Sequence, residues 1–600
     1  MEQLLELARE RKLDRVGATY AVVAWILVQA ASIALPAFAA PAWVLRWLIV
    51  AAMAGFPLVL AGAWVNSGRA PMAAAPRAPF DRKDWLLTGL IGLVAVLLLV
   101  QLALGFSWRS TRSASQPIPQ QAVSSVAVLP FANLSGDPSK AYFSDGIADQ
   151  LISELARTPS LRVAARTSSF AFRGKEVDVK TIAKALNVRS VLEGSLREDG
   201  NRVRIAAELV DASNGFQIWS QTYDRDLTSI LALQDEIAGS ISRALNQRFW
   251  GKPGTPARPV QRRRIDPEVY KLYLQGQYYL AQRTRDGVTR AIELFKRVTD
   301  IAPDYADGIA SLADAKSVDA LNFEKLDQVG AAATAADKAL MLDPHNSTAL
   351  LARARISLLK WKWRAVADDL RQLDRLHVNT AIVWRTKAVF FDYMGLSQFS
   401  GAAEQKAVQL DPLSFLDHYN IALYAMLSKH HDYAMKAAGD ALALQPGNSE
   451  VLTLQCEIEN MRGRVAEARK IYNKLAALAK PGEPPGDEAG CLFYIEVTEK
   501  NYAAAHKIVD IAAAAFPASG ISATDIGIGY ARANDIDAAI KWFRRALQVR
   551  DPQVFRVPYF DRDMTKLFAD SRWKMLRDTP EVRNWEEARR ETARDFQMGE

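Results

Sequence analysis

Short apolar runs alternate with a helical apolar pattern in the stretch that begins at residue 125. Ser125–Phe131 and Leu161–Ala165 are short and mainly apolar, which predicts two buried strands. Between them, Ile147, Leu151 and Leu155 recur four residues apart, so they predict a helix with one apolar face. This alternation of strand and helix is typical of an α/β sheet domain.

The hydrophobic period changes to two further along the chain. Apolar and polar residues alternate from Val203 to Leu209, which predicts a strand with one buried face. Turn residues at 198–201 and 214–215 join this strand to its neighbours, so we expect a meander. Further helices are predicted at Asp178–Leu186 and around Leu233–Leu245. The whole pattern predicts a small α/β domain over residues 125–250.

Short motifs follow one another through this predicted domain. They are Val126–Phe131, Asp145-Gly146, Arg166–Ser168, Val191–Ser195, Arg204-Ile205, Trp219, Tyr223–Asp226 and Gln234–Glu236. In this order they resemble the TolB-amino-terminal/FlgO-like domain. The resemblance implies a bacterial envelope or signalling protein, in which such domains are often followed by helical repeats and sometimes fused to cyclase or DNA-binding domains. It implies no catalytic residues, and we expect Trp219 and Tyr223 to be packing residues.

A third pattern recurs about every 34 to 37 residues from Pro267 onward, which is the length of a tetratricopeptide repeat with small insertions. A small residue is followed by packing residues at +4 and +7 and by proline, or a substitute, at +12. The copies begin at Ala291, Ala332, Ala434, Ala468, Ala505 and Ala539, and weaker ones lie around residues 366–378 and 400–412.

These copies predict stacked helical hairpins, since no single hairpin can bury its apolar face alone. We therefore expect an all-α tetratricopeptide solenoid of about eight repeats over residues 267–552. Capping helices are predicted over residues 553–600. Residues 251–266, rich in proline and glycine, are predicted to be a linker.

The first sixth of the chain is strongly apolar. Three stretches, about residues 16–35, 44–65 and 86–106, are long enough to predict transmembrane helices. Residues 1–108 are therefore predicted to be a membrane anchor and residues 109–124 a tether. A signal peptide is the alternative for the first stretch, and an interfacial helix is the alternative for the second.

The distribution of Lys and Arg predicts an orientation for such an anchor. Basic residues precede the first stretch and lie between the second and third, but none lies between the first and second. Because cytoplasmic loops carry the excess of Lys and Arg, three spans would place the later domains outside the cytoplasm. The predicted location is thus a multi-pass protein of the bacterial inner membrane with periplasmic domains.

Composition adds few constraints. The net charge of +8 is spread along 600 residues, so it is a weak basis for nucleic-acid binding, and we expect none. The two cysteines, Cys456 and Cys491, exclude a disulfide-rich scaffold. Cys456 occupies a position where its repeat needs a small packing residue; a Cys456–Cys491 disulfide between neighbouring repeats is the alternative.

Several residues carry potential chemistry. Gly527-Ile-Gly529 begins a dinucleotide fingerprint but lacks the third glycine and a preceding strand. Asp145 and Asp149 lie one turn apart and are interpreted as complements of a helix dipole. His418 and His430-His431 are expected to be surface or packing residues, and Lys360–Arg364 to pack in a turn between helices. We predict no catalytic, cofactor-binding or metal-binding residues.

The leading hypothesis is a non-enzymatic, membrane-anchored interaction scaffold whose tetratricopeptide array binds a protein or peptide on its concave surface. One alternative is a signalling component that acts with a nucleotide cyclase or transcriptional partner. Another is an enzyme hidden in the α/β domain, which contains no histidine or cysteine. The repeats could also serve only as a spacer.

Overall fold

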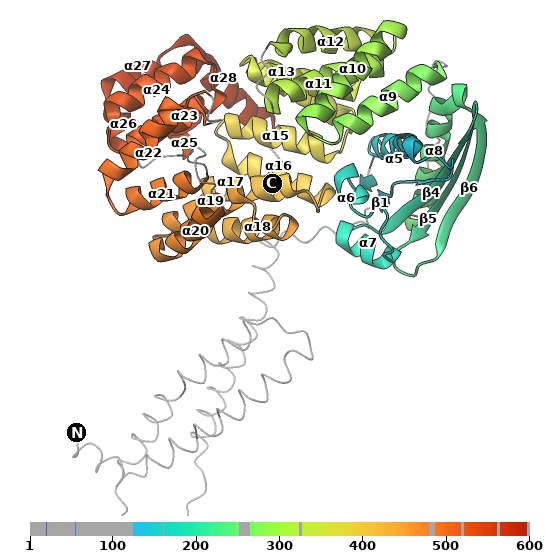
Figure 1. Cartoon of the computed structure of the whole chain (residues 1–600), viewed down its shortest axis with the longest axis horizontal. Helices are drawn as coiled ribbons and strands as arrows, with labels where there is room; N and C mark the ends of the chain where they lie inside the picture. The colour runs from blue at the N-terminus through green and yellow to red at the C-terminus, as the bar shows by residue number, and fades with distance from the viewer. Residues whose placement is uncertain are drawn as a thin grey trace, which may run out of the picture. The chain divides into compact units, whose positions relative to one another are not determined.

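The computed structural model describes residues 124–159, 161–250, 265–322, 327–478, 487–517, 521–560 and 564–596, together with Tyr20, Ala24 and Gly55. Ile118–Glu600 form one compact unit and Met1–Pro117 another. Within the larger unit, a small α/β part is followed by a long series of helices (Figure 1).

The prediction of transmembrane helices is corrected. In the part of the chain that the structure describes, no helix combines the length and the apolarity needed to cross a bilayer. The longest helix, α8 (Ile230–Trp250), has 21 residues but includes Asp235, Glu236, Arg243 and Arg248. The predicted spans at 16–35, 44–65 and 86–106 lie outside the described residues apart from Tyr20, Ala24 and Gly55. The multi-pass, inner-membrane and periplasmic location that rested on them is withdrawn.

The sheet has the predicted order of two βα steps followed by a meander. Its strands lie in the order β3-β1-β4-β5-β6, and the short β2 pairs with β4. β1 is parallel to both of its neighbours, whereas β4, β5 and β6 are antiparallel. The strands are β1 Ser124–Val128, β2 Ala132–Asn133, β3 Leu161–Val163, β4 Ser190–Asp199, β5 Arg202–Asp211 and β6 Gln217–Asp226.

Two helices cover one face of this sheet and one helix covers part of the other. α5 (Ala141–Leu155) and α8 pack on the first face, where Val203, Ile205 and Tyr223 are buried as the alternation predicts. α7 (Val179–Leu186) packs on the opposite face beside β1 and the start of β4. The remaining short helices are η1 Pro138–Lys140, α6 Arg166–Phe170 and η2 Leu227–Ser229.

The helical part consists of antiparallel hairpins, as the repeat pattern predicts. The second helices α10, α12 and α18 end just before Pro303, Pro344 and Pro446, because proline cannot continue a helix. The recurring alanines are fully buried where helices cross, for example Ala291, Ala332, Ala336, Ala434 and Ala438.

The helices of this part are α9 Pro267–Leu280, α10 Arg285–Ile301, α11 Ala306–Asn322, α12 Gln328–Leu342, α13 Ser347–Leu359, α14 Trp363–Arg375, α15 Ala381–Tyr393, α16 Ser397–Leu410, α17 Phe415–Leu427, α18 His431–Leu444, α19 Ser449–Met461, α20 Val465–Leu478, α21 Asp487–Thr498, α22 Tyr502–Ala514, α23 Ala523–Arg532, α24 Ile536–Gln548, η3 Pro552–Phe555, α25 Val557–Phe560, α26 Thr565–Ala569, α27 Ser571–Arg577 and α28 Pro580–Asp595.

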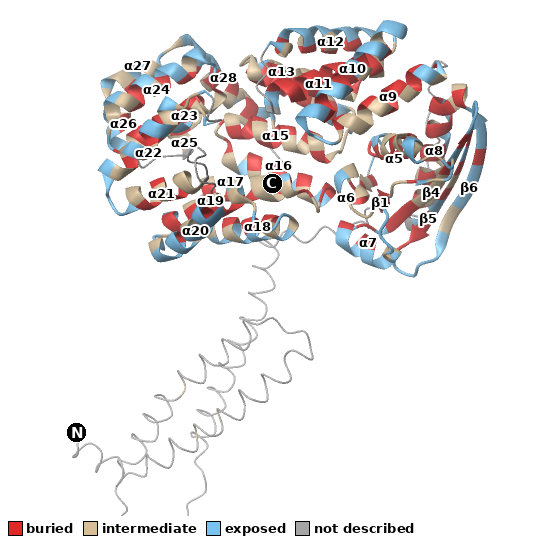
Figure 2. Ribbon diagram, viewed as in Figure 1, coloured by how far each residue is buried: buried red, intermediate tan, exposed pale blue. Residues whose placement is uncertain are grey.

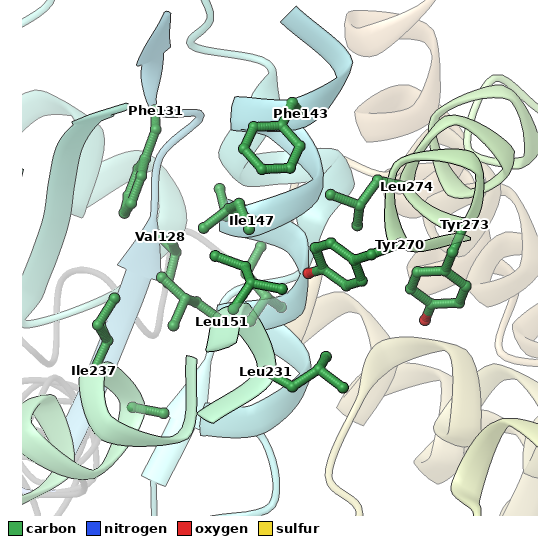
Figure 3. Close-up of a cluster of buried hydrophobic side chains, with 14 of the residues drawn as sticks. Val128, Phe131, Phe143, Ile147, Leu151, Leu231, Ile237, Tyr270, Tyr273 and Leu274 are labelled. Atoms are coloured by element: carbon green, nitrogen blue, oxygen red, sulfur yellow. The ribbon is translucent and has the colours of Figure 1, made fainter. Parts of the chain in front are cut away.

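The α/β part and the first hairpins share one hydrophobic core. Buried residues continue without a break from Val126 in β1 to Val318 in α11. Tyr270 and Leu274 of α9 point toward α5, as Figure 3 shows. The two helices come so close at Gly146 that an added Cβ there would lie 2.8 Å from a methyl carbon of Leu274. Gly146 therefore serves close helix packing, which its place in a motif did not reveal.

The carboxyl-terminal helices return to the middle of the array. α28 packs against α14, and Trp585 stacks on Phe555 with ring centroids 5.6 Å apart. The Trp585 indole donates a hydrogen bond to the carbonyl of Tyr393 at 3.0 Å. The turn at residues 360–364 packs as predicted, since Trp363 is buried and its ring lies edge-on to Phe555. The chain's own end thus covers α14 and the end of α15.

Candidate functional site

A second contact between the α/β part and the repeats, besides the α5–α9 packing, is polar and buried. Ser168, in α6, donates from its backbone and its hydroxyl to one carboxylate oxygen of Asp411, at 3.1 and 2.6 Å. The same hydroxyl accepts from the backbone of Leu413 at 2.9 Å. Ser168 and Asp411 are both buried, so this contact replaces the water that each would otherwise bind.

Asp411 also belongs to a charged network inside the repeats. Arg385 of α15 lies 3.6 Å from its second oxygen and holds Asp417 of α17 with two hydrogen bonds. Glu404, which is fully buried, accepts from Asn420 at 3.0 Å. Burial, and then the neighbouring Asp417 charge, raises the pKa of Glu404 well above its usual range. The network therefore holds charges in place rather than exposing them.

A second group of charges comes from the first helices of successive hairpins. Arg556, just after η3, forms an ion pair with the buried Asp392 of α15. Tyr424 of α17 lies in the same electrostatic environment, and burial raises its pKa well above the usual value. The carboxyl-terminal segment thus contributes the cation that neutralises the inward-facing carboxylate of α15.

The next three first helices carry polar side chains that stay partly accessible. Arg532 of α23 lies 4.9 Å above the ring of Tyr494 in α21, and both are half-buried. Glu457 of α19 is also half-buried, and burial raises its pKa to about 7, although Arg532 opposes that shift. Asp525 of α23 is exposed and accepts from Ser522 at 2.8 Å. We call Glu457, Tyr494, Asp525 and Arg532 the first-helix cluster.

This cluster offers a guanidinium, two carboxyl groups and an aromatic face within one electrostatic neighbourhood. Such groups recognise hydrogen-bond donors, acceptors and cations by contact, and side chains on rigid helices hold their geometry well. Sequence reasoning missed the cluster, because single charged residues in amphipathic helices look like ordinary solvated positions. The available signal was their recurrence on the first helix of three consecutive repeats.

The acidic pair of α5 does not complement a helix dipole, so that interpretation is wrong. α5 begins at Ala141, which places Asp145 and Asp149 beyond the first turn. Asp145 is buried and lies 2.5 Å from Arg173, and Asp149 lies 3.7 Å from Arg166. Both arginines also lie over the ring of Phe170. The two carboxylates therefore fix α6 and its following turn onto α5.

The other sequence candidates are structural. Gly527 and Gly529 lie within α23, where an added Cβ would crowd Phe543 and Val509. Cys456 and Cys491 are buried and joined by a disulfide, the alternative that the sequence left open. The His418 ring makes a hydrogen bond with the carbonyl of Pro412. In the described ranges, no group of three or more His, Cys, Asp or Glu side chains is placed to hold a metal ion.

A pocket of about 580 Å³ lies beside the loop between α23 and α24, and Tyr502, His506 and Asp535 are among its lining residues. The two His506 nitrogens lie 3.0 Å from Asp510 and 2.9 Å from Asp535. These hydrogen bonds, above all the one to Asp535, raise the pKa of His506. The imidazole is thus held between two carboxylates of neighbouring hairpins.

Comparison with known proteins gives two partial sequence matches. A family model described as "HilA/YgeH-like transcriptional regulator, second domain" matches residues 121–240. The protein "Putative adenylate cyclase 3" of Rhizobium meliloti (strain 1021) is 40% identical over 210 residues, which are 35% of this chain and 35% of that protein. The chain therefore spans about a third of the length of the curated relative it matches. The TolB-amino-terminal/FlgO-like resemblance stays a prediction.

Solved structures with helical repeats are also similar. The crystal structure of YrrB, "a TPR protein with an unusual peptide-binding site", has 13% identity and a TM-score of 0.26, covering 31% of this chain and 93% of its own. The human IFIT1 dimer with PPP-AAAA has 16% identity and a TM-score of 0.31, covering 54% of this chain and 84% of its own. With its paired helices, buried alanines and prolines after second helices, this chain is a tetratricopeptide-like repeat protein that also carries a small α/β domain.

Proposed function

We propose that the protein is a non-enzymatic interaction scaffold that binds a segment of a partner protein at the first-helix cluster. The observation that carries the proposal is the accessibility of Glu457, Tyr494 and Arg532 on three successive first helices. Partial burial costs charged side chains part of their hydration, even where Arg532 lies over the Tyr494 ring. A bound segment with its own donors and acceptors would repay that cost.

The fold limits where such a partner can bind. Phe555, Trp585 and Arg556 already fill the inner side of α14 and α15, and Arg385 is committed to Asp417. We therefore place the partner on the first helices from α19 onward. Because Glu457 and Asp525 both present carboxyl oxygens there, we expect a partner segment that presents Lys, Arg or amide donors.

Double replacement of the cluster tests this proposal. The full-length chain, with Glu457→Ala and Arg532→Ala, is compared with the wild type in capture of partners from cell extract, read out by quantitative mass spectrometry. The matched control is Arg469→Ala with Glu499→Ala, which removes an exposed ion pair between α20 and the residue that follows α21. We expect at least a tenfold loss of specific partners for the cluster variant and none for the control. Equal capture by all three proteins would refute the site.

A regulatory role is the second candidate, and the two partial sequence matches favour it. Residues 121–240 match a domain of transcriptional regulators, and a 210-residue stretch is similar to a putative adenylate cyclase. The chain would then act through a cyclase or transcriptional partner held by the repeats. Identification of captured proteins decides this: a cyclase or regulator supports the role, whereas partners of neither kind speak against it.

A further inference from the structure

One face of the sheet carries like charges directly opposite one another. Glu193 of β4 lies opposite Glu208 of β5. Four residues further along β4, Arg197 lies opposite Arg204 of β5. These side chains point away from the core, because their neighbours Leu192, Leu196, Val203, Ile205 and Leu209 are the ones that the core buries. Within the described residues, none of the four charged side chains forms an ion pair.

Such pairs destabilise a lone sheet, since opposed like charges repel across the strands. Burial, and then the charge of Glu208, raises the pKa of Glu193. On β6, Asp224 lies opposite Arg204 but is bound by Arg202 at 2.5 Å. Exchanging one acid and one base between the two pairs would remove both repulsions within a single chain. Among the described residues, the present arrangement leaves both repulsions in place.

A row of small residues separates the two pairs. Ala132, Ser195, Ala206 and Thr222 lie side by side across β2, β4, β5 and β6. The acidic pair lies two residues to one side of this row and the basic pair two residues to the other. α7 packs at a different part of this face, and the β6 strand is largely exposed (Figure 2). The outer sheet face therefore has an acidic wall, Glu193 and Glu208, and a basic wall, Arg197 and Arg204, on either side of a row of small residues.

This arrangement is complementary to itself. A two-fold axis that runs along the row of small residues would bring a second sheet face to face with the first. The rotation exchanges the two walls, so each acidic pair would meet the basic pair of the other copy. A pairing of this kind is isologous, because the same patch serves both subunits. Sheets pack about 10 Å apart, which long Glu and Arg side chains can span, while the small residues allow the approach.

We propose that the outer sheet face is a self-association surface, on which Glu193 and Glu208 of one copy bind Arg197 and Arg204 of a second copy. Three ten-residue strands, with about 3.3 Å per residue and about 4.8 Å between strands, give a footprint on the order of 500 Å² per copy. Surfaces of this size support transient rather than permanent complexes. The association is therefore concentration-dependent and weakens with ionic strength.

A variant in which one acidic and one basic residue are exchanged separates loss of self-association from loss of folding. Glu193→Lys combined with Arg197→Glu keeps the net charge, turns both cross-strand pairs into attractive ones and leaves Arg204 opposite Asp224. We expect this variant to melt at a higher temperature than the wild type and to lose self-association. Sedimentation velocity of the full-length chain over a concentration series measures the second effect, and we expect the dissociation constant to rise at least tenfold. Association through any other surface is present in both proteins and cancels in the comparison.

Mixing two further variants tests the pairing itself. Glu193→Lys with Glu208→Lys makes both walls basic, and Arg197→Glu with Arg204→Glu makes both acidic. Neither should associate alone, whereas an equimolar mixture should form a heterodimer. Self-association by each variant alone, or a mixture that stays monomeric, would overturn the proposal. A wild type that is monomeric at every concentration would overturn it as well, and unchanged association of the exchange variant would point to pairing along the β6 edge instead.

Discussion

Asp411 shows how much one side chain can connect in this molecule. Its first oxygen receives two hydrogen bonds from Ser168 of the α/β part, and its second lies near Arg385 of the repeats. Ser169, the next residue in α6, is equally buried, but its hydroxyl has no hydrogen-bond partner among the described residues. Of these two adjacent buried serines, Ser168 is thus the one whose hydroxyl bonds to Asp411 and links the α/β part to the repeats.

We expect Ser168→Ala to destabilise the protein and Ser169→Ala to leave its stability unchanged or slightly raised. The first replacement removes a donor to a buried carboxylate and an acceptor for Leu413, which costs about 1–3 kcal/mol. The second removes an unpaired hydroxyl. Urea unfolding of the full-length chain measures both. Equal effects of the two replacements would mean that the Asp411 contact contributes nothing.

The carboxyl group of Glu457 makes the stability of the protein depend on pH. Burial raises its pKa from the ordinary value of 4.5 to about 7 in the folded protein. Because the native state holds the proton more tightly than the unfolded state, stability falls as pH rises from about 4.5 to about 7. We expect Glu457→Gln to raise the free energy of unfolding on the order of 1–3 kcal/mol above that of the wild type at pH 8, and to leave it unchanged at pH 4.5.

Urea midpoints at pH 5 and pH 8 measure this difference. Glu450 is exposed at the start of the same helix, so Glu450→Gln is the matched control, whose effect should not grow with pH. A pH-independent effect of Glu457→Gln would show that its carboxyl is ionised throughout. The sequence could not predict this shift in the pKa of Glu457, since it arises from burial in the folded chain and then from Asp525 of α23, rather than from the pattern around Glu457.

At the scale of elements, periodicity predicted the helices and strands well. The alternation from Val203 to Leu209, the prolines after second helices and the recurring alanines each report a local backbone requirement. It did not predict which surfaces meet. The α5–α9 contact and the closure of α28 on α14 depend on shape complementarity between segments far apart in the chain, for which a single sequence carries no periodic signal.

The α5–α9 contact makes opposite predictions for two glycines in the helices of one core. An added Cβ at Gly146 would lie 2.8 Å from Leu274, whereas at Gly239 in α8 it would meet only the end of the Arg243 side chain, at 3.4 Å. We expect Gly146→Ala to destabilise by about 1–3 kcal/mol through overpacking. Gly239→Ala should instead stabilise by about 0.5–1 kcal/mol, because alanine favours the helix.

Thermal melting of the two single variants measures the contrast. Leu274→Ala supplies the second control, since it removes the atoms that the new methyl would crowd. In the Leu274→Ala background we expect Gly146→Ala to be neutral or stabilising. If Gly146→Ala costs the same in both backgrounds, its effect does not arise from the packing of α5 on α9.

For the whole molecule, the continuity of the core matters more than the order of domains along the chain. Buried residues run from β1 through α5 and α9 to α11, and Gln234, within a motif of the α/β part, donates to Tyr270 of α9 at 2.6 Å. Lys271 of α9 also pairs with the buried Glu198 of β4 at 2.5 Å. The first hairpins therefore complete the α/β part, and the two should unfold together.

Two shortened chains test that statement. Residues 124–250 contain the whole sheet but leave the α9-facing side of α5 uncovered, whereas residues 124–342 add α9 to α12. We expect the longer chain to melt cooperatively and the shorter one to melt at least about 10 °C lower, with a broad transition and strong binding of a hydrophobic dye. Gln234→Leu in the longer chain, which removes the hydrogen bond to the buried Tyr270 hydroxyl, should lower its melting temperature but keep the transition sharp. A shorter chain that melts as sharply and at the same temperature as the longer one would show that the α/β part folds independently and that the shared core adds no stability.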